Sequence, residues 1–309
     1  MAKQKLLLVD GSSLAFRAFF SILDLNRFKN SNGLHTNALY SFHRMFKSIL
    51  DSEKPTHVLV AWDAGKTTFR TEMYADYKGG RSKTPGEFIE QMPYFNVLLD
   101  AWGIPHYRLN QYEADDIIGT LARKGEEAGY EVVVLSGDKD LIQLADNNIT
   151  VKITTKGVTE LVEYTPEVIF EKYGLTPEQI IDMKGLMGDS SDNYPGVTKV
   201  GEKTAVKLLQ EFGSVEGIYE HVDEMKKSKL KENLINDKEL AFLSKKLARI
   251  NVESPIEITL EDTLRKEQDV DALMSFYKEM NFNSFQSDLL NSGGATVEEA
   301  PKAERPTVK

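Results

Sequence analysis

The chain has 309 residues, with 48 acidic and 38 basic side chains, no cysteine and a formal net charge of -10. The absence of cysteine excludes disulfides, thiolate nucleophiles, iron–sulfur clusters and cysteine-ligated zinc. No apolar run of about 18 residues predicts a membrane span, and the N-terminal MAKQKLLLVD lacks the pattern of a signal peptide. The length predicts one large domain or a main domain with a smaller one. The acidic balance argues weakly against a protein that coats nucleic acid.

The first part of the chain alternates short apolar segments with amphipathic ones. The apolar segments predict strands at residues 5–10, 57–63, 104–109 and 132–136. The amphipathic segments predict helices near 36–51, 86–102 and 113–128. Nearly continuous apolar strands separated by helices are typical of a mostly parallel sheet with helices on both faces. We therefore predict an α/β domain over residues 1–165, with an edge hairpin at 150–155 and 158–164 around Lys156-Gly157.

After residue 165 the pattern becomes helical. Short helices are predicted near residues 166–173, 177–187, 202–212, 214–220, 224–234, 237–250 and 270–290. Pro166 and Pro177 each follow a threonine, which is typical of a capped helix with proline in its first turn. Residues 166–290 are therefore expected to form a helical subdomain. The tail, 291–309, is small, polar and proline-bearing, and we expect a flexible linker there.

Acidic residues follow the predicted strands at the point where each strand ends. In an open parallel sheet these points face one crevice. We therefore expect the first seven of the following carboxylates to face each other, with the last two at the start of the helical subdomain. The set is Asp10, Asp63, Glu113, Asp115, Asp116, Asp138, Asp140, Asp189 and Asp192.

Each of these residues taken alone is more often a helix cap or a turn residue. That interpretation does not explain several such sites on one sheet edge, because crowded carboxylates repel unless they are protonated or bridged by cations. Hard oxygen ligands without cysteine or a histidine cluster favour Mg²⁺ or Mn²⁺, and two such ions suit phosphodiester hydrolysis. The chain has no H-E-x-x-H and no G-x-S-x-G, so the zinc-protease and serine-hydrolase classes are excluded.

A basic segment follows the second strand, at residues 66–83. It carries five basic side chains against two acidic ones, with aromatic residues between them and the flexible pair Gly79-Gly80. One interpretation is a mobile, solvated loop. The other is an arch over the metal site, with cations on the scissile phosphate and aromatic rings, Tyr77 among them, stacked on unpaired bases.

Residues 196–204, GVTKVGEKT, differ from a phosphate-binding loop by one inserted residue and do not follow a strand. We interpret them as a helix–hairpin–helix, in which glycines let the backbone approach a DNA phosphate and the next helix presents free N–H groups. The alternative is an ordinary glycine-containing helix connection. Residues 224–249 carry eight basic and four acidic side chains and extend the basic surface, although such a run is usually a solvated helix face.

Six stretches in one order resemble the 5′-nuclease (flap endonuclease) superfamily, and within it the 5′→3′ exonuclease domains of bacterial DNA polymerase I. They are LLLVDGSSLAFRAFF, AWDAGKTTFR, YKGGR, YEADDIIGTLA, SGDKDLIQL and GLMGDSSDNYPGVTKVGEKTA. The resemblance covers about residues 5–290. It implies a PIN-like sheet flanked by helices, a helical arch at about 66–95, and a helix–three-turn–helix (helix-hairpin-helix) region at 188–213.

The resemblance also implies roles for individual residues. One Mg²⁺ or Mn²⁺ ion would be held by Asp10, Asp63, Glu113 and Asp115, and a second by Asp138, Asp140 and Asp192, with Asp116 and Asp189 as outer ligands. Lys78 and Arg81 match the basic arch residues that act in catalysis, and Arg70 is a third candidate. The hairpin residues Gly196, Lys199, Gly201, Lys203 and Thr204 would contact DNA, and potassium is a further candidate ion there.

The implied activity is metal-dependent hydrolysis of DNA, or of an RNA primer, near 5′ ends, nicks or flap junctions. The implied setting is a bacterial cytoplasm, in replication and repair, as a monomer with a polymerase portion following or as a stand-alone exonuclease. Two alternatives remain open: a PIN-like ribonuclease, which the long helical region disfavours, and a non-catalytic module that binds DNA structures, which the carboxylate set disfavours.

Overall fold

The computed structural model describes residues 3–155 and 160–292 and contains one six-stranded sheet. Its strands are β1 (Lys5–Asp10), β2 (His57–Trp62), β3 (His106–Arg108), β4 (Glu131–Ser136), β5 (Ile149–Thr154) and β6 (Leu161–Tyr164). The strand order is β3-β2-β1-β4-β5-β6, and every pair is parallel except β5 with β6. The predicted fold class, a mostly parallel α/β sheet with an edge hairpin, is confirmed. The predicted turn at Lys156-Gly157 lies outside the described residues.

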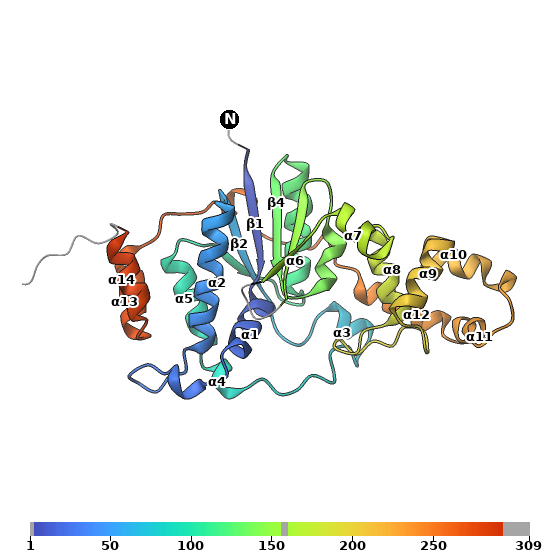
Figure 1. Cartoon of the computed structure of the whole chain (residues 1–309), viewed down its shortest axis with the longest axis horizontal. Coiled ribbons are helices and arrows are strands. Elements are labelled where there is room, and N and C mark those ends of the chain that lie inside the picture. Colours follow the sequence, from blue (N-terminus) through green and yellow to red (C-terminus); the bar gives the residue numbers. More distant parts are fainter. Residues whose placement is uncertain (1–2, 156–159, 293–309) are drawn as a thin grey trace, which may run out of the picture.

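The helices of the first part of the chain are α1 (Gly11–Ser21), α2 (Asn37–Glu53), α3 (Phe69–Met73), α4 (Gly86–Ile89), α5 (Met92–Ala101) and α6 (Ala114–Glu127), with the 3₁₀ turns η1 (Leu25–Arg27) and η2 (Lys139–Leu144). Of these, α1, α2 and α5 cover one face of the sheet and α6 covers the other (Figure 1). Helix α1 is absent from the sequence-based prediction. Its start, Gly11-Ser12-Ser13, has the composition of a loop, yet Asp10 caps it by accepting a hydrogen bond from the Ser13 amide.

The side chains of each central strand alternate between two apolar clusters. Leu6 and Leu8 of β1 face a cluster that includes α6 and helices of the second part of the chain. Leu7 and Val9 face a cluster built by α1, α2 and α5. Successive side chains of a strand point to opposite faces, so a strand buried on both faces is apolar throughout.

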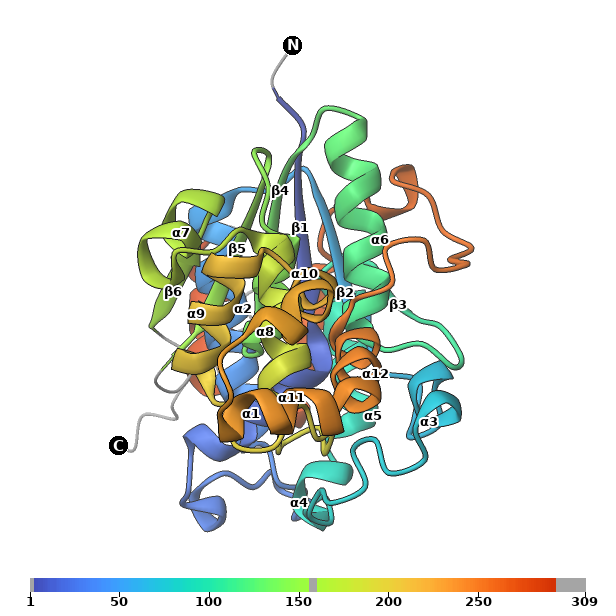
Figure 2. The ribbon, with the colours of Figure 1, turned by 90° about the vertical axis from the view of Figure 1, so that its right-hand side faces the viewer.

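The second part of the chain is helical, as predicted. Its elements are α7 (Pro166–Tyr173), α8 (Pro177–Met187), α9 (Glu202–Phe212), α10 (Val215–His221), η3 (Val222–Glu224), α11 (Lys229–Asn236), α12 (Lys238–Ala248), η4 (Glu261–Thr263), α13 (Val270–Glu279) and α14 (Asn283–Asn291). Thr165 and Thr176 cap α7 and α8, and each precedes a proline in the first turn. Figure 2 shows this part from the side on which α8 to α12 lie in front of the sheet.

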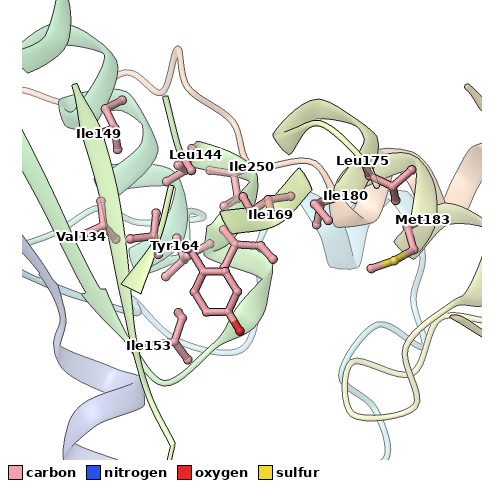
Figure 3. Packing of buried hydrophobic residues seen from close by; sticks show 14 of the residues in the cluster. Val134, Leu144, Ile149, Ile153, Tyr164, Ile169, Leu175, Ile180, Met183 and Ile250 are labelled. Carbon is pink, nitrogen blue, oxygen red and sulfur yellow. The ribbon is translucent and has the colours of Figure 1, made fainter. Parts of the chain in front are cut away.

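Packing ties the two parts of the chain together. Val134 and Ile153 of the sheet lie in the same apolar cluster as Ile169 of α7 and Ile180 of α8 (Figure 3). Helices α13 and α14 lie apart from α8 to α12, on the side of the sheet where α2 and α5 lie (Figure 1), and share their cluster. Residues 166–290, predicted as one helical subdomain, therefore pack in two separate regions, with α13 and α14 beside α2 and α5.

Residues 66–95, predicted as a helical arch, contain only the short helices α3 and α4 before α5 begins. The loop that joins α3 to α4 runs along the lower edge of the molecule in Figure 1. The predicted linker at 291–309 lies, from residue 293 on, outside the described residues. Among the described helices, none is both long and apolar enough to cross a membrane.

Candidate metal centre

The strand order places three acidic strand ends at the carboxyl edge of the sheet. β1 lies between β2 and β4, with Asp10 opposite Ala61 and Val9 opposite Leu135. Asp63 follows the end of β2, and Asp138 follows the end of β4 by two residues. The crossovers leave the sheet in opposite directions on the two sides of β1, which is where α/β sheets form their binding crevice.

Asp10 and Asp138 are each both a helix cap and a member of the acidic edge. Asp10 Oδ1 accepts a hydrogen bond from the Ser13 amide at 3.1 Å, and its Oδ2 accepts one from Ser136 Oγ at 2.7 Å. Asp138 caps η2 by accepting a hydrogen bond from the Asp140 amide at 2.9 Å. The capping role and the site role, weighed as alternatives from the sequence, are compatible because a cap fixes the carboxylate at the edge.

The N-terminus of α6 adds three more carboxylates. Asp63 Oδ1 accepts a hydrogen bond from the Ala114 amide at 2.8 Å, which joins the end of β2 to the start of this helix. Asp116 turns back to accept one from the Glu113 amide at 3.1 Å. The pKa of Asp115 is raised well above its usual value because the group is removed from water and lies near Asp10 and other carboxylates.

The remaining acidic residues come from η2 and from the loop that follows α8. Asp140, Asp189 and Asp192 each offer an oxygen, and these oxygens lie within 4.8 Å of one another. Asp189 is held by its own loop, since its Oδ1 accepts hydrogen bonds from the amides of Ser191 and Asp192 at 2.8 and 3.2 Å. The structure thus brings all nine predicted acidic residues to one edge.

Four basic side chains contact this acidic edge. Lys78 bonds Glu113, and Arg81 Nη2 lies 2.6 Å from Asp192 Oδ1. Arg70 bonds Glu113 and Asp116 at 2.5 and 2.8 Å. The fourth, Lys184 on α8, was not singled out from the sequence, and its Nζ lies 3.0 Å from Asp140 and 2.5 Å from Asp189. The sequence feature that could have identified Lys184 is a single lysine five residues before Asp189.

Arg70 is the most enclosed of these cations, with 3% of its side chain exposed. Its guanidinium donates to both oxygens of Asp116 and also to the carbonyls of Leu247 and Arg249, beside the end of α12. Since all of its nitrogens bond protein acceptors, this geometry gives no support to the predicted contact with a substrate phosphate. Arg70 instead joins α3, α6 and α12.

Tyr77 also lies inside the protein. It is buried beside Tyr194 and Leu247, and its hydroxyl donates toward Glu113 at 3.3 Å. This placement gives no support to the predicted stacking on unpaired bases, which requires an exposed ring. Lys78 and Arg81, on the same loop between α3 and α4 as Tyr77, differ from both residues because they are partly exposed.

Glu113 and Asp116 pair with Arg70 and Lys78, and the other seven acidic residues divide into two groups by their ion pairs. We call Asp10, Asp63, Asp115 and Asp138 the strand-end group; within residues 3–155 and 160–292, none of them makes an ion pair. We call Asp140, Asp189 and Asp192 the loop group, which Lys184 and Arg81 contact. Burial, and then the neighbouring carboxylate of Asp63, raise the pKa of Asp10.

A basic side chain that lies close to a carboxylate opposes the rise in pKa that burial causes. Burial alone would raise the pKa of Glu113, but Lys78 and Arg70 hold it below its usual range. Burial would likewise raise the pKa of Asp189, but Lys184 and Ser191 hold it low. Asp140 keeps a raised pKa because burial and the Asp138 carboxylate outweigh its contact with Lys184.

The donor set fits divalent cations that prefer oxygen. Every candidate ligand is a carboxylate, and nine carboxylates face four basic side chains. Asp140 Oδ1 is buried, and its charged neighbour among the described residues is the Lys184 ammonium, 3.0 Å away. Carboxylates buried without a basic partner, such as Asp10 and Asp138, are costly unless a proton or a cation neutralises them. The arrangement can therefore hold divalent cations that prefer oxygen ligands.

The predicted hairpin follows the loop group directly. Gly196 has φ of +61°, and a Cβ at this position would lie 2.3 Å from the Gly188 nitrogen, so both its conformation and its space require glycine. Gly201 precedes α9 without capping it by a side chain, so the first amides of α9 have no side-chain acceptor. Lys199 and Lys203 are exposed beside this helix start, and Thr204 is half-buried.

Comparison with known proteins relates residues 5–271 to one family. Residues 5–174 match the family model described as 5′-3′ exonuclease, N-terminal resolvase-like domain. Residues 175–271 match the model described as 5′-3′ exonuclease, C-terminal SAM fold. The division between these matches falls between α7 and α8.

Curated relatives and solved structures agree with these matches. The chain is 60% identical over 298 residues to DNA polymerase I of Lactococcus lactis subsp. cremoris (strain MG1363), which covers 96% of this chain and 34% of that protein. It is 53% identical over 307 residues to DNA polymerase I of Bacillus subtilis (strain 168), covering 99% and 34%. The chain therefore spans about a third of the length of these relatives.

Among solved structures, T5 5′-exonuclease with bound divalent metal ions (zinc) is similar at a TM-score of 0.66 and 25% identity, covering 93% of this chain and 99% of that one. The catalytic core of Rad2 in complex with a DNA substrate is similar at a TM-score of 0.63 and 16% identity, covering 95% and 93%. The second likeness bears on the fold alone.

Proposed function

The chain belongs to the 5′-3′ exonuclease family, and from this premise we propose that it is a structure-specific 5′→3′ exonuclease and flap endonuclease. Its substrate would be DNA with a 5′ end, nick or flap, and RNA primers paired with DNA. The observation that carries the proposal is the acidic edge itself, where carboxylates from three strand ends meet beside Lys78 and Arg81.

We propose that the acidic edge holds two divalent ions, Mg²⁺ or Mn²⁺. Asp10, Asp63, Glu113 and Asp115 would hold one ion, and Asp138, Asp140 and Asp192 the other. Asp116 and Asp189 would act through neighbouring groups, which agrees with Asp116 receiving hydrogen bonds from Arg70 and from the amides of Glu113 and Asn251. When bound, such ions supply an activated water and neutralise charge on a phosphodiester undergoing in-line displacement.

The chain's own cations would bind and orient the phosphate. Lys78 and Arg81 sit on a loop, and without substrate they bond Glu113 and Asp192. Once a phosphate is present, the same two side chains can exchange these carboxylates for its oxygens and stabilise the charge that develops there. Arg70 would act as a positioning residue, since it fixes Glu113 and Asp116 against α12.

The hairpin after the loop group would hold the duplex. The uncapped start of α9 presents backbone N–H groups to a DNA phosphate, and Lys199 and Lys203 lie exposed beside it. Such contacts fix the position of the duplex without reading its sequence. Potassium remains a candidate ion at this hairpin, where backbone carbonyls would be its ligands.

The high identity to DNA polymerase I relatives supports a cellular setting. We propose that this chain is the 5′-nuclease part of such a polymerase, acting in primer removal and repair in a bacterial cytoplasm, with the polymerase portion as its covalent partner. The stand-alone exonuclease remains the second candidate for its setting.

A labelled flap substrate tests the activity directly. A 5′-labelled flap duplex is incubated with the wild-type chain, with Asp138→Ala and with Lys78→Ala, each with and without Mg²⁺. We expect cleavage near the junction only with Mg²⁺, its loss in Asp138→Ala, and a decrease of about 100-fold or more in Lys78→Ala, as for the removal of one preorganised charge-stabilising group.

The exposed pair Lys47 and Asp51 on α2 supplies matched controls, because Lys47→Ala and Asp51→Ala remove the same charges far from the acidic edge in the fold. Cleavage that survives chelation, or that is unchanged in Asp138→Ala, would contradict the two-ion assignment. Faster cleavage of single-stranded RNA than of the flap would favour the ribonuclease alternative.

A further inference from the structure

Lys184 lies inside the loop group. It belongs to the last turn of α8, and 18% of its side chain is exposed. Its Nζ lies 3.0 Å from Asp140 Oδ1 and 2.5 Å from Asp189 Oδ2. Oxygens of these two residues and of Asp192 lie within 4.8 Å of one another, so the ammonium group contacts Asp140, a ligand of the proposed second ion, and Asp189 beside it.

The net charge of the loop group disfavours a further cation while Lys184 and Arg81 contact its carboxylates. Its three carboxylates are contacted by two basic side chains, Lys184 and Arg81, so one negative charge remains without a counter-charge. A divalent ion added to this arrangement would make the group net positive. Like charges a few ångströms apart repel, and they repel more strongly where water is excluded. The ion and the ammonium group therefore compete for the same carboxylates.

Lys184 neutralises the loop group without satisfying all of it. Its Nζ donates a hydrogen bond to Asp189 Oδ2, whereas its contact with Asp140 Oδ1, at 3.0 Å, is an ion pair. Lys245 makes the contrast clear, because it sits between Asp182 and Glu216 and donates hydrogen bonds to both. A carboxylate oxygen left with a lone pair is one that an incoming ion can use at once.

The two cations of the loop group also differ in how they can leave it. Arg81 is exposed and sits on the loop between α3 and α4, so it can move with that loop. Lys184 sits on a helix packed against α12 and η2, so its backbone is fixed and only its side chain can rotate away. The fold therefore keeps the backbone of Lys184 beside Asp140 and Asp189, while its ammonium group can leave them by rotation of the side chain.

We propose that Lys184 is a built-in counter-ion of the loop group, which holds Asp140 and Asp189 together in the metal-free protein and is displaced when a divalent ion binds there. This rests on the proposed function, in which the loop group takes part in holding the second ion. Lys184 then sets the affinity of that ion: the weaker its hold on the two carboxylates, the tighter the ion binds.

Manganese binding without DNA tests this directly. Free Mn²⁺ is measured by electron paramagnetic resonance while the wild-type chain, Lys184→Met and Lys184→Gln are titrated with Mn²⁺ alone. We expect the weaker of two sites to tighten by about tenfold in both variants, within the usual range of coupling between two sites. In chelator, both variants should melt at a lower temperature than the wild type, because the loop group loses its counter-ion.

Lys245→Met is the matched control, since it removes a similarly enclosed lysine between two carboxylates on α12. It should lower the melting temperature without tightening Mn²⁺ binding. An unchanged or weakened second site in both Lys184 variants would overturn the inference while leaving the proposed function intact. A wild-type chain that binds no Mn²⁺ would overturn both.

The wild-type chain offers a second measurement that does not depend on a folded variant. An amine-acetylating reagent is applied with and without Mg²⁺, and modification of each lysine is quantified by mass spectrometry. Lys184 should react faster with Mg²⁺ because its ammonium is displaced into solvent, while Lys245 should not change. A Lys184 rate that falls or stays constant on adding Mg²⁺ contradicts the displacement.

Discussion

The strand-end group and the loop group contain the same side chain and meet at the same edge, yet they are stabilised differently. In the strand-end group, Asp10, Asp115 and Asp138 have raised pKa values, with burial as the largest cause, and no basic side chain of the described residues bonds them. In the loop group, Lys184 and Arg81 contact the carboxylates.

The comparison teaches that a buried carboxylate can be tolerated in two ways. A cation held by the fold can keep it ionised, as Lys184 does for Asp189, or its pKa can rise until a proton or an external cation neutralises it, as for Asp10. The strand-end group is therefore the part of the edge with the greater electrostatic demand for an added ion.

The largest expected effect on stability comes from replacing Arg70, because all nitrogens of its guanidinium bond protein acceptors. Arg70→Met leaves the buried carboxylates of Glu113 and Asp116 without their partner, and breaking such a buried pair costs about 3–5 kcal/mol in the free energy of unfolding. Urea denaturation in chelator measures this loss. Arg70→Lys should recover only part of the stability because lysine cannot reproduce the two-pronged contact. A loss under about 1 kcal/mol would show that the two carboxylates do not depend on Arg70.

A change of pH in the absence of metal should have an effect of intermediate size on the stability of the chain. The folded-state pKa values of Asp10 and Asp140 are raised to about 7, above the unfolded value, so the folded chain binds more protons over this range. Their contribution is present at low pH and is lost as pH rises through about 7. Stability in chelator should therefore increase as pH falls from 8 to 5, by about 1–3 kcal/mol.

Mg²⁺ should remove this pH dependence, because bound ions favour the ionised carboxylates. Glu113 and Asp189 have lowered pKa values and contribute in the opposite direction, but only at pH values below their usual range. Denaturation curves at several pH values, with chelator and with Mg²⁺, measure both effects. Stability in chelator that decreases steadily from pH 8 to 5 would contradict the raised pKa values.

The smallest expected effect is on the melting temperature, which should change in opposite directions when one aspartate of each group is replaced by asparagine. In chelator, Asp10→Asn removes a repelled charge and keeps an oxygen to cap α1, so the melting temperature should rise. Asp189→Asn removes the partner of Lys184, so the melting temperature should fall. Each change should correspond to about 1 kcal/mol, typical of single substitutions of this kind. Shifts of the same sign in both variants would break the division into two groups.

The sequence was sufficient to predict the acidic edge because strand ends and chain order are local features. Asp10, Asp63 and Asp138 each follow an apolar segment, and parallel strands bring such ends together. The hairpin was predictable for the same reason, since Gly196 and Gly201 lie within one short stretch. Helix α1 was missed because Gly11-Ser12-Ser13 resembles a loop when its cap, Asp10, is counted as the end of a strand.

Residue type and spacing by themselves predicted the fold class, an oxygen-rich ligand set and the meeting of seven carboxylates at one sheet edge, whereas Asp189 and Asp192 were assigned to it only through the family resemblance. Only the tertiary structure decided which cations reach them. Arg70 is buried because carbonyls of Leu247 and Arg249, far along the chain, accept its hydrogen bonds, and Lys184 enters the site because α8 packs beside η2. The local sequence pattern specifies the position of a charged residue on its own helix or strand. The packing of distant segments specifies which residue of opposite charge it contacts.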